Sequence, residues 1–508
     1  MRASSARRAT SPNAYEVIGL FLESSSCPAV LDPGEDPIPI GPDNFKLESR
    51  GGILTLEVWS ETRNLVRRVT GVRFQHRARL ELIIEKFGGR TGALSLIDLA
   101  HPGSHEVTRR GLRLKYRERF RRSLLRQFPG WRVAELSAEP DLEHSLTPSY
   151  PRALLRKGSA ALAAIGAAED ATDVDGALTF GLIWLDYLRR RDSRVPIQGL
   201  AIFVPAGQEA ITCHRVRHLN ASATCAIFVH FSDGFEDAVD PRDYTNFDTR
   251  IDPCHRPLVT APAQTVDWVE RMQSVKDVDR RDHPDGAVSL AVHGLEFARA
   301  TGERMLFGLD HKHEATTAAH LVEIEALARG IAARRAPGGP RESSLYSRNP
   351  EAWLESQVRR HIETVDASLW THPLYGQVPE FAGGERGVLD ILACDRSGRL
   401  AVVEIKASQD VHLPLQALDY WMRVKWHLER GEFSGRGYFP GIELRPDPPR
   451  LLLVAPALDF HPSNETILRF LDTDIDVERI GVAIEWRQEL RVMFRSSVPP
   501  CRFPSSAK

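Results

Sequence analysis

Three ionisable residues lie close together in the sequence and have types and spacing suited to chemistry: Asp390, Glu404 and Lys406. Asp390 stands in the apolar run 388–392, and the other two end a second apolar run that begins at residue 400. Side chains alternate along a strand, so Glu404 and Lys406 point to the same face. Burying two carboxylates and a lysine is costly unless they bind something. The pattern therefore indicates a ligand site on a β-hairpin.

The elements around these residues predict how they are positioned. A polar turn joins the two apolar runs, as in a hairpin. An apolar stripe with an acidic first turn predicts a helix just before the hairpin. The remaining segments alternate between strand and helix patterns, which predicts an α/β domain with a mixed sheet flanked by helices. The predicted elements are a helix over 351–365, strands at 375–381, 388–392 and 400–405, a helix over 413–430, a strand at 451–457, a short helix at 465–471 and a strand at 480–486.

An acid followed after 13 residues by Glu-x-Lys resembles the motif of the PD-(D/E)XK nuclease superfamily, and the likeness covers residues from about 350 to 488. Gln416 and Tyr420 are similar to the Gln-x-x-x-Tyr element of its RecB-like branch. Glu355 resembles the acid that this branch often carries on its first helix. The superfamily places a proline before the first acid, and here Leu389 occupies that position.

The resemblance implies a restriction-endonuclease-like sheet and a divalent metal, Mg²⁺ or Mn²⁺, as cofactor. Asp390 and Glu404 would hold the metal with help from the carbonyl of Ile405 and from Glu355. Lys406 would orient or activate the attacking water. Gln416 and Tyr420 would lie beside the metal site as part of the catalytic set.

General chemistry agrees with this interpretation, because carboxylate oxygens suit Mg²⁺ or Mn²⁺, which can polarise a phosphate and supply hydroxide near neutral pH. A lysine beside them can stabilise charge on phosphate oxygens. We therefore expect a metal-dependent deoxyribonuclease that recognises DNA structure rather than sequence, in repair, recombination or defence. The residues expected to contact backbone phosphates are Arg359, Arg360, Arg386, Arg423 and Lys425.

Other interpretations stay open. The domain could grip nucleic acid or a protein partner without cutting it. In a purely structural protein, Glu404 and Lys406 would be an exposed pair on a strand and Asp390 an ordinary edge residue. The choice between DNA and RNA is also open, although DNA is the favoured substrate.

An earlier segment resembles the hairpin. Residues 157–170 align with residues 397–410, which places Ala164 and Gly166 where Glu404 and Lys406 stand, and Tyr150 where Asp390 stands. A helix-like segment and an apolar run follow in both places. One explanation is a duplicated domain whose first copy has lost its chemistry. The other is chance similarity between two strands rich in Ala, Val and Leu.

The chain divides into segments of different character. Residues 1–40 are rich in Ser, Pro, Ala and Gly and are expected to be poorly ordered. Residues 41–107 predict an antiparallel β-rich module. The rest divides into a degenerate nuclease-like domain (108–250), a connecting β/α segment and linker (251–344) and the nuclease-like domain itself (345–500). Within the segment 108–250, residues 108–126 hold nine basic residues and one acid, which fits a solvated helix face or a phosphate-binding ridge.

The composition of the 508-residue chain is that of an ordinary globular protein, with a formal net charge of −2 and six scattered cysteines without a Cys-x-x-Cys pair. This fits a reducing cytoplasm better than a disulfide framework or a zinc site. No signal peptide or membrane-length apolar run is evident, so a cytoplasmic protein without membrane contact is expected. Protein partners and oligomeric state are open. The layout also resembles an uncharacterised bacterial family, through GLEFAR at 294–299 and PALDFHP at 456–462.

Overall fold

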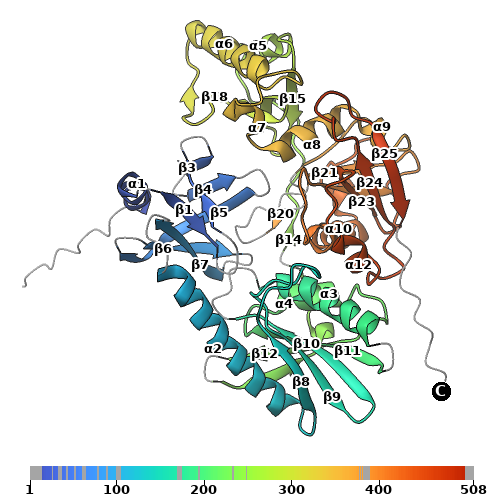
Figure 1. Cartoon of the computed structure of the whole chain (residues 1–508). Helices are drawn as coiled ribbons and strands as arrows, with labels where there is room; N and C mark the ends of the chain where they lie inside the picture. The colour runs from blue at the N-terminus through green and yellow to red at the C-terminus, as the bar shows by residue number, and fades with distance from the viewer. Residues whose placement is uncertain are drawn as a thin grey trace, which may run out of the picture.

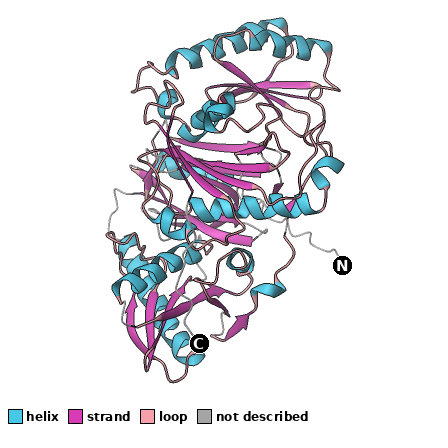
Figure 2. Cartoon of the chain, turned by 90° about the vertical axis from the view of Figure 1, so that its right-hand side faces the viewer, coloured by secondary structure: helices cyan, strands magenta, loops and turns pink. Residues whose placement is uncertain are grey.

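The structure is a computed structural model (Figure 1). It describes residues 14–497 apart from 26, 33–36, 42–43, 51–52, 60–63, 77–78, 87–89, 99–103, 169–173, 193–194, 232–233, 248, 377, 379 and 382–389. Among the described residues, no helix is long and apolar enough to cross a membrane. The predicted mixed α/β class is confirmed, since two sheets contain both parallel and antiparallel pairs while the sheet of strands β1–β7 is antiparallel. Figure 2 shows helices packed beside the sheets.

The N-terminal sheet is antiparallel, as the sequence predicts, and its strand order is β2-β1-β7-β6-β5-β4-β3. Alternating apolar residues of these strands form a buried cluster of their own on one face of the sheet. The strands are β1 (Pro28–Leu31), β2 (Ile38–Pro39), β3 (Phe45–Arg50), β4 (Ile53–Trp59), β5 (Asn64–His76), β6 (Arg79–Lys86) and β7 (Arg90–Asp98).

The expectation of disorder over residues 1–40 is wrong for the elements described within 14–40. Helix α1 (Ala14–Ser24) buries Val17, Ile18 and Phe21 against the N-terminal sheet. Strands β1 and β2 then pair with each other, and β1 also pairs with β7. These apolar residues recur at helical spacing and form a buried stripe, and surrounding Ser and Pro residues obscured that stripe in the sequence.

The first α/β unit (residues 104–239) is a mixed sheet of order β13-β12-β11-β10-β9-β8. Helix α2 (Ser104–Gln127) contains the basic segment, and it buries Phe120 and Leu124 against one face of the sheet. Helices α3 and α4 belong to the opposite face. The other elements are β8 (Arg132–Ser137), β9 (Arg152–Lys157), β10 (Ala160–Gly166), α3 (Gly176–Arg191), β11 (Ile197–Pro205), α4 (Ala210–Val216), β12 (Cys225–His230) and β13 (Glu236–Val239).

The middle unit (residues 263–334) is a five-stranded antiparallel sheet with two helices packed on it. Its elements are α5 (Ala263–Gln273), β15 (Val278–Asp282), β16 (Val288–Val292), β17 (Leu295–Thr301), β18 (Arg304–Phe307), β19 (His313–Glu314) and α6 (Ala318–Arg334). The short α7 (Ser344–Ser347) follows, and a two-stranded pairing joins β14 (Thr249–Arg250) to β20 (Glu380–Phe381).

The second α/β unit (residues 350–497) is a mixed sheet of order β21-β22-β23-β24-β25. Helix α8 covers one face of this sheet, and α10 and α12 cover the other. Its elements are α8 (Pro350–Arg360), α9 (Ile362–Val365), β21 (Ile391–Cys394), β22 (Leu400–Ile405), α10 (Leu413–Glu429), α11 (Glu432–Gly435), β23 (Arg450–Pro456), α12 (Ser463–Leu468), β24 (Val477–Val482) and β25 (Val492–Ser497).

The two α/β units share one pattern of strand pairing. From β9 to β13, neighbouring strands run antiparallel, parallel, parallel and antiparallel. From β21 to β25 the order of directions is the same. Helix α3 connects the first parallel pair in one unit and α10 connects it in the other, while α4 and α12 connect the second parallel pair.

Candidate functional site

A β-hairpin carries the three residues singled out by their spacing. Every residue of β21 and β22 is buried, so the hairpin belongs to the core of the unit although β21 is the edge strand of its sheet. The connecting turn is closed by the Asp395 carboxylate, which accepts from the N–H groups of Ser397 (2.8 Å) and Arg399 (3.0 Å). Asp390 lies just before β21, and Lys406 follows the last residue of β22.

The structure brings Asp390, Glu404 and Lys406 together. The Asp390 carboxylate accepts a hydrogen bond from the backbone N–H of Ile405 at 2.7 Å, which ties the start of β21 to the end of β22. The Glu404 side chain is only 3% exposed, and its Oε1 lies 3.5 Å from Lys406 Nζ. Its other oxygen, Oε2, is buried without a hydrogen-bond partner among the described residues. Such an oxygen is costly unless a ligand reaches it.

Burial and mutual repulsion shape the charges of this cluster. Burial raises the pKa of Glu404 to about 7, although Lys406 opposes the shift. Burial and then the charges of Glu404 and Glu355 raise the pKa of Asp390 well above its usual range. Burial would lower the pKa of Lys406, but the surrounding carboxylates, Glu351 first, raise it well above the usual value. Lys406 is therefore a stable cation, whereas the ionised forms of Asp390 and Glu404 beside it are disfavoured.

Helix α8 presents two acids one turn apart, and they have different surroundings. The Glu355 carboxylate, expected to be a metal ligand, is instead held between Arg359 Nε at 2.8 Å and Arg281 at 2.9 Å. These arginines lower its pKa against the effect of burial. Glu351 has no ion-pair partner among the described residues, and its charge acts on Lys406, Glu404 and Asp390. Glu351 is thus a site residue that the motif comparison missed.

The middle unit supplies the second arginine on Glu355. Arg281 lies in β15, and its neighbour Asp279 accepts from Arg360 of α8 at 2.7 Å. The turn between β16 and β17 approaches α8 so closely that a Cβ on Gly294 would lie 1.9 Å from the Ala352 carbonyl oxygen. The sequence carried no signal that the middle unit would help to position α8.

Helix α10 packs on β22 and β23 and carries the other two predicted site residues. Tyr420 is 6% exposed, and burial followed by the Glu404 charge raises the pKa of its phenol well above its usual range. Its phenol therefore stays neutral beside the acids. Gln416 is half-buried on the same helix, one turn earlier.

The described residues that were predicted to contact phosphates are engaged by other groups of the chain. Arg359 is engaged by Glu355 and by the Asp390 carbonyl. Arg423 is 1% exposed and donates to the Asp419 carbonyl at 2.7 Å, so its assignment as a phosphate contact is wrong: burial against the rest of the chain removes it from solvent. Arg360 pairs with Asp279, and Lys425 pairs with Glu429. Arg386 lies outside the described residues.

The site fits a small divalent cation as a two-carboxylate site. No group of three His, Cys, Asp or Glu side chains in the described part of the chain forms a metal cluster. Mg²⁺ nevertheless keeps several waters and binds proteins through one or two carboxylates. The Oε2 of Glu404 and the second oxygen of Asp390 provide such a pair, and the charge of a cation there would oppose the burial, and after it the nearby carboxylate charges, that raise the pKa of both acids.

Comparison with known protein-family models, curated proteins and solved structures found no match to this chain.

Proposed function

We propose that the second α/β unit is a metal-dependent nuclease that hydrolyses phosphodiester bonds of DNA, by structure rather than by sequence. The observation that carries this proposal is the buried Glu404 with the half-buried Asp390 next to it, and a Glu404 oxygen left without a hydrogen-bond partner among the described residues beside the ammonium of Lys406. The resemblance of Asp390, Glu-x-Lys and the Gln-x-x-x-Tyr element to the PD-(D/E)XK superfamily supports the same conclusion.

The chain's own residues have separable roles in this proposal. Glu404 and Asp390 would hold Mg²⁺ or Mn²⁺, which when bound would polarise a phosphate oxygen and make hydroxide available near neutral pH. Lys406 remains protonated because four carboxylates raise its pKa, so it acts as a hydrogen-bond donor to phosphate or water and not as a base. The position of such a cation suits the charge that develops on phosphate oxygens.

The remaining residues position this set. The Ile405 N–H fixes the Asp390 carboxylate, and Arg359 holds the Asp390 carbonyl while Glu355 orients Arg359. Preorganised groups of this kind stabilise a transition state without reorganising at the moment of reaction. Glu355 is accordingly a positioning residue in the proposal, and Glu351 is the acid of α8 that influences Lys406.

A substrate panel tests the proposed activity. Purified full-length chain is incubated with labelled single- and double-stranded DNA and RNA, in Mg²⁺, in Mn²⁺ and with a chelator. Cleavage of DNA that requires metal and is lost in Asp390→Asn supports the proposal. Cleavage of RNA alone corrects the substrate, and cleavage that survives in Asp390→Asn overturns the site.

A nucleic-acid-binding module without hydrolysis is the second candidate. The observation in its favour is that Lys406 already pairs with Glu404 at 3.5 Å, which can replace a metal as the counter-charge. That candidate predicts DNA binding that is indifferent to metal and no strand breaks in any condition of the same panel.

A further inference from the structure

The two α/β units meet through equivalent surfaces. After α4 and after α12, the two segments form an antiparallel bridge. Around it, the Asn220 N–H donates to the Phe470 carbonyl at 2.8 Å, and the Asp472 N–H donates to the His218 carbonyl at 2.9 Å. Each of these two bonds is the equivalent of the other when the first unit is superposed on the second. Reciprocal contacts of this kind are the mark of an isologous, two-fold interface.

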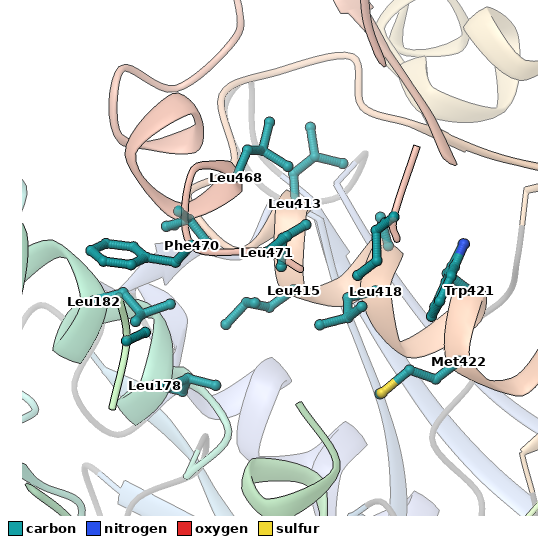
Figure 3. Close-up of a cluster of buried hydrophobic side chains, with 14 of the residues drawn as sticks. Leu178, Leu182, Leu413, Leu415, Leu418, Trp421, Met422, Leu468, Phe470 and Leu471 are labelled. Carbon is teal, nitrogen blue, oxygen red and sulfur yellow. The ribbon is translucent and has the colours of Figure 1, made fainter. Parts of the chain in front are cut away.

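Helix packing follows the same rule. Helix α3 packs against α12 of the other unit, and its counterpart α10 packs against α4. The side chains between them belong to one continuous buried cluster that spans both units. Figure 3 shows Leu178 and Leu182 of α3 near Leu415 of α10 and near Phe470 and Leu471 after α12. The interface thus has the apolar core of a permanent dimer within one chain.

Backbone hydrogen bonds align the two sheets residue by residue. The Lys406 N–H donates to the Val454 carbonyl at 2.9 Å, and the Ala167 N–H donates to the Phe203 carbonyl at 2.8 Å. These bonds occupy the same place, between the end of the hairpin and the next parallel strand. Ala167 therefore stands where Lys406 stands, one residue away from the position of Gly166 that the sequence alignment predicts.

The same alignment identifies the counterparts of the two acids. Ile165 takes the place of Glu404, and Arg152, which lies opposite Ile165 in the β9–β10 register, takes the place of Asp390. Ala164, the predicted counterpart of Glu404, faces α2 instead. The reason is that the two turns differ in length. Residues 157 and 160 pair in β9–β10, whereas residues 394 and 400 pair in β21–β22, so an alignment without gaps through the turns misplaces the strands.

At the positions equivalent to Asp390, Glu404 and Lys406, the first unit therefore has no carboxylate to bind a cation. Arg152 is 5% exposed, donates to the Glu139 carbonyl at 2.9 Å and lies over the Trp184 ring at 5.6 Å. A buried guanidinium in the position of a metal-binding carboxylate repels a divalent cation. Ile165 and Ala167 supply neither a carboxylate nor an ammonium.

We propose that the chain is an internal dimer with one working site, which binds double-stranded DNA and cuts one strand per encounter. This inference rests on the proposed function. A two-fold protein arrangement matches the two-fold relation between the strands of a duplex, so each unit addresses one strand. Hydrolysis adds one water across one P–O bond: the water oxygen bonds to phosphorus, a strand oxygen leaves, and a proton passes to that oxygen.

The experiment uses closed-circular supercoiled DNA in excess over the full-length chain. Supercoiled, nicked and linear forms are quantified over time, and the mass of the protein in solution is measured under the same conditions. The inference predicts that a monomeric chain converts supercoiled DNA to nicked circles, which accumulate before linear DNA appears. Linear DNA that forms together with nicked circles overturns it, as does a rate that rises with the square of the protein concentration.

Metal stoichiometry separates this inference from the proposed function. Titration with Mn²⁺ alone is expected to find one site per chain, lost in Glu404→Gln and retained in Arg152→Ala; if that variant does not fold, Ile165→Leu serves as the control. Two sites per chain, or retention of the site in Glu404→Gln, overturn the one-site assignment. A chain that binds one Mn²⁺ but cuts no nucleic acid retains the one-site assignment and overturns the proposed hydrolysis.

Discussion

The carboxylate of Asp390 accepts a 2.7 Å hydrogen bond from the backbone N–H of Ile405, so one acid of the site is oriented by the strand that carries the other. The two acids come from opposite strands of one hairpin, and their separation depends on hairpin register and not on a flexible loop. A site held this way is organised before any ligand arrives. The repulsion between the Asp390 and Glu404 carboxylates is consequently present in the folded protein before a ligand binds.

The raised pKa of Glu404, which is due first to its burial, predicts a pH-dependent stability. The folded pKa of Glu404 is about 7, against 4.5 for the free side chain. Between these values the folded state keeps a proton on Glu404 that the unfolded state has lost, so the contribution of Glu404 lowers stability as pH rises from 4.5 to about 7. Glu404→Gln removes the effect and is expected to raise the free energy of unfolding by about 3 kcal/mol at pH 8, with little change at pH 4.5.

Urea unfolding at both pH values measures this difference in metal-free buffer. Glu363→Gln, an exposed residue of the same unit, is the matched control and is expected to leave stability unchanged. A wild-type protein that is more stable than Glu404→Gln at pH 8 would contradict the account of the site's charge.

Metal affinity is expected to depend on pH for the same reason. A carboxylate must lose its proton before it binds a cation, so Mn²⁺ affinity rises by about tenfold per pH unit below the pKa of Glu404. The part of the dependence that comes from Glu404 flattens above pH 7, the pKa that burial gives Glu404. Calorimetric titration at several pH values measures both the affinity and the protons released. An affinity that is constant from pH 5.5 to 8 is incompatible with these ligands.

The two acids of α8 are expected to behave differently on substitution. Glu355→Ala leaves Arg281 and Arg359 without their shared counter-charge and is expected to cost about 3 kcal/mol of stability. Glu351→Ala removes an acid without an ion-pair partner in the described structure, and it is expected to change stability by less than about 0.5 kcal/mol. Its effect falls on Lys406, so cleavage is expected to drop by about tenfold or more. The reverse pattern would restore Glu355 as the site acid.

A buried ion pair between the units gives a test of their interface. Arg215 of α4 donates to both oxygens of Asp419 in α10, at 2.9 and 2.8 Å. Arg215→Ala leaves Asp419 buried without its partner and is expected to cost about 3–5 kcal/mol. Thermal unfolding should lower the transition of both α/β units together. Two separate unfolding transitions, of which only one moves to a lower temperature in the variant, would show that the units do not share a core.

Much of the candidate site follows from local sequence. Two apolar runs with a polar turn predict the hairpin because its strands are fully buried, and the acids stand out because they interrupt those runs. Helix α10 follows from its apolar spacing, and it begins at Leu413 as predicted. These features depend on neighbouring residues alone.

What could not be predicted depends on contacts between distant segments. Glu351 and Glu355 share a helix face, and only the docking of β15, with Arg281, determines which of them is neutralised. Arg423 reads as a surface cation beside an active site, but the interface between the units buries it. The likeness between the two hairpins was visible in the sequence. The residue-by-residue alignment between them was not, because the turns that connect their strands differ in length.

The most direct measurement is the single-turnover cleavage rate of labelled duplex DNA in Mg²⁺ and Mn²⁺. It is compared among the wild type, Asp390→Asn, Glu404→Gln, Lys406→Met and the control Glu363→Gln, with folding checked by circular dichroism. The account predicts metal-dependent cleavage by the wild type and the control, and loss of at least about a thousandfold in the three site variants. Equal rates in the wild type and the folded site variants, or cleavage that persists without metal, would contradict it.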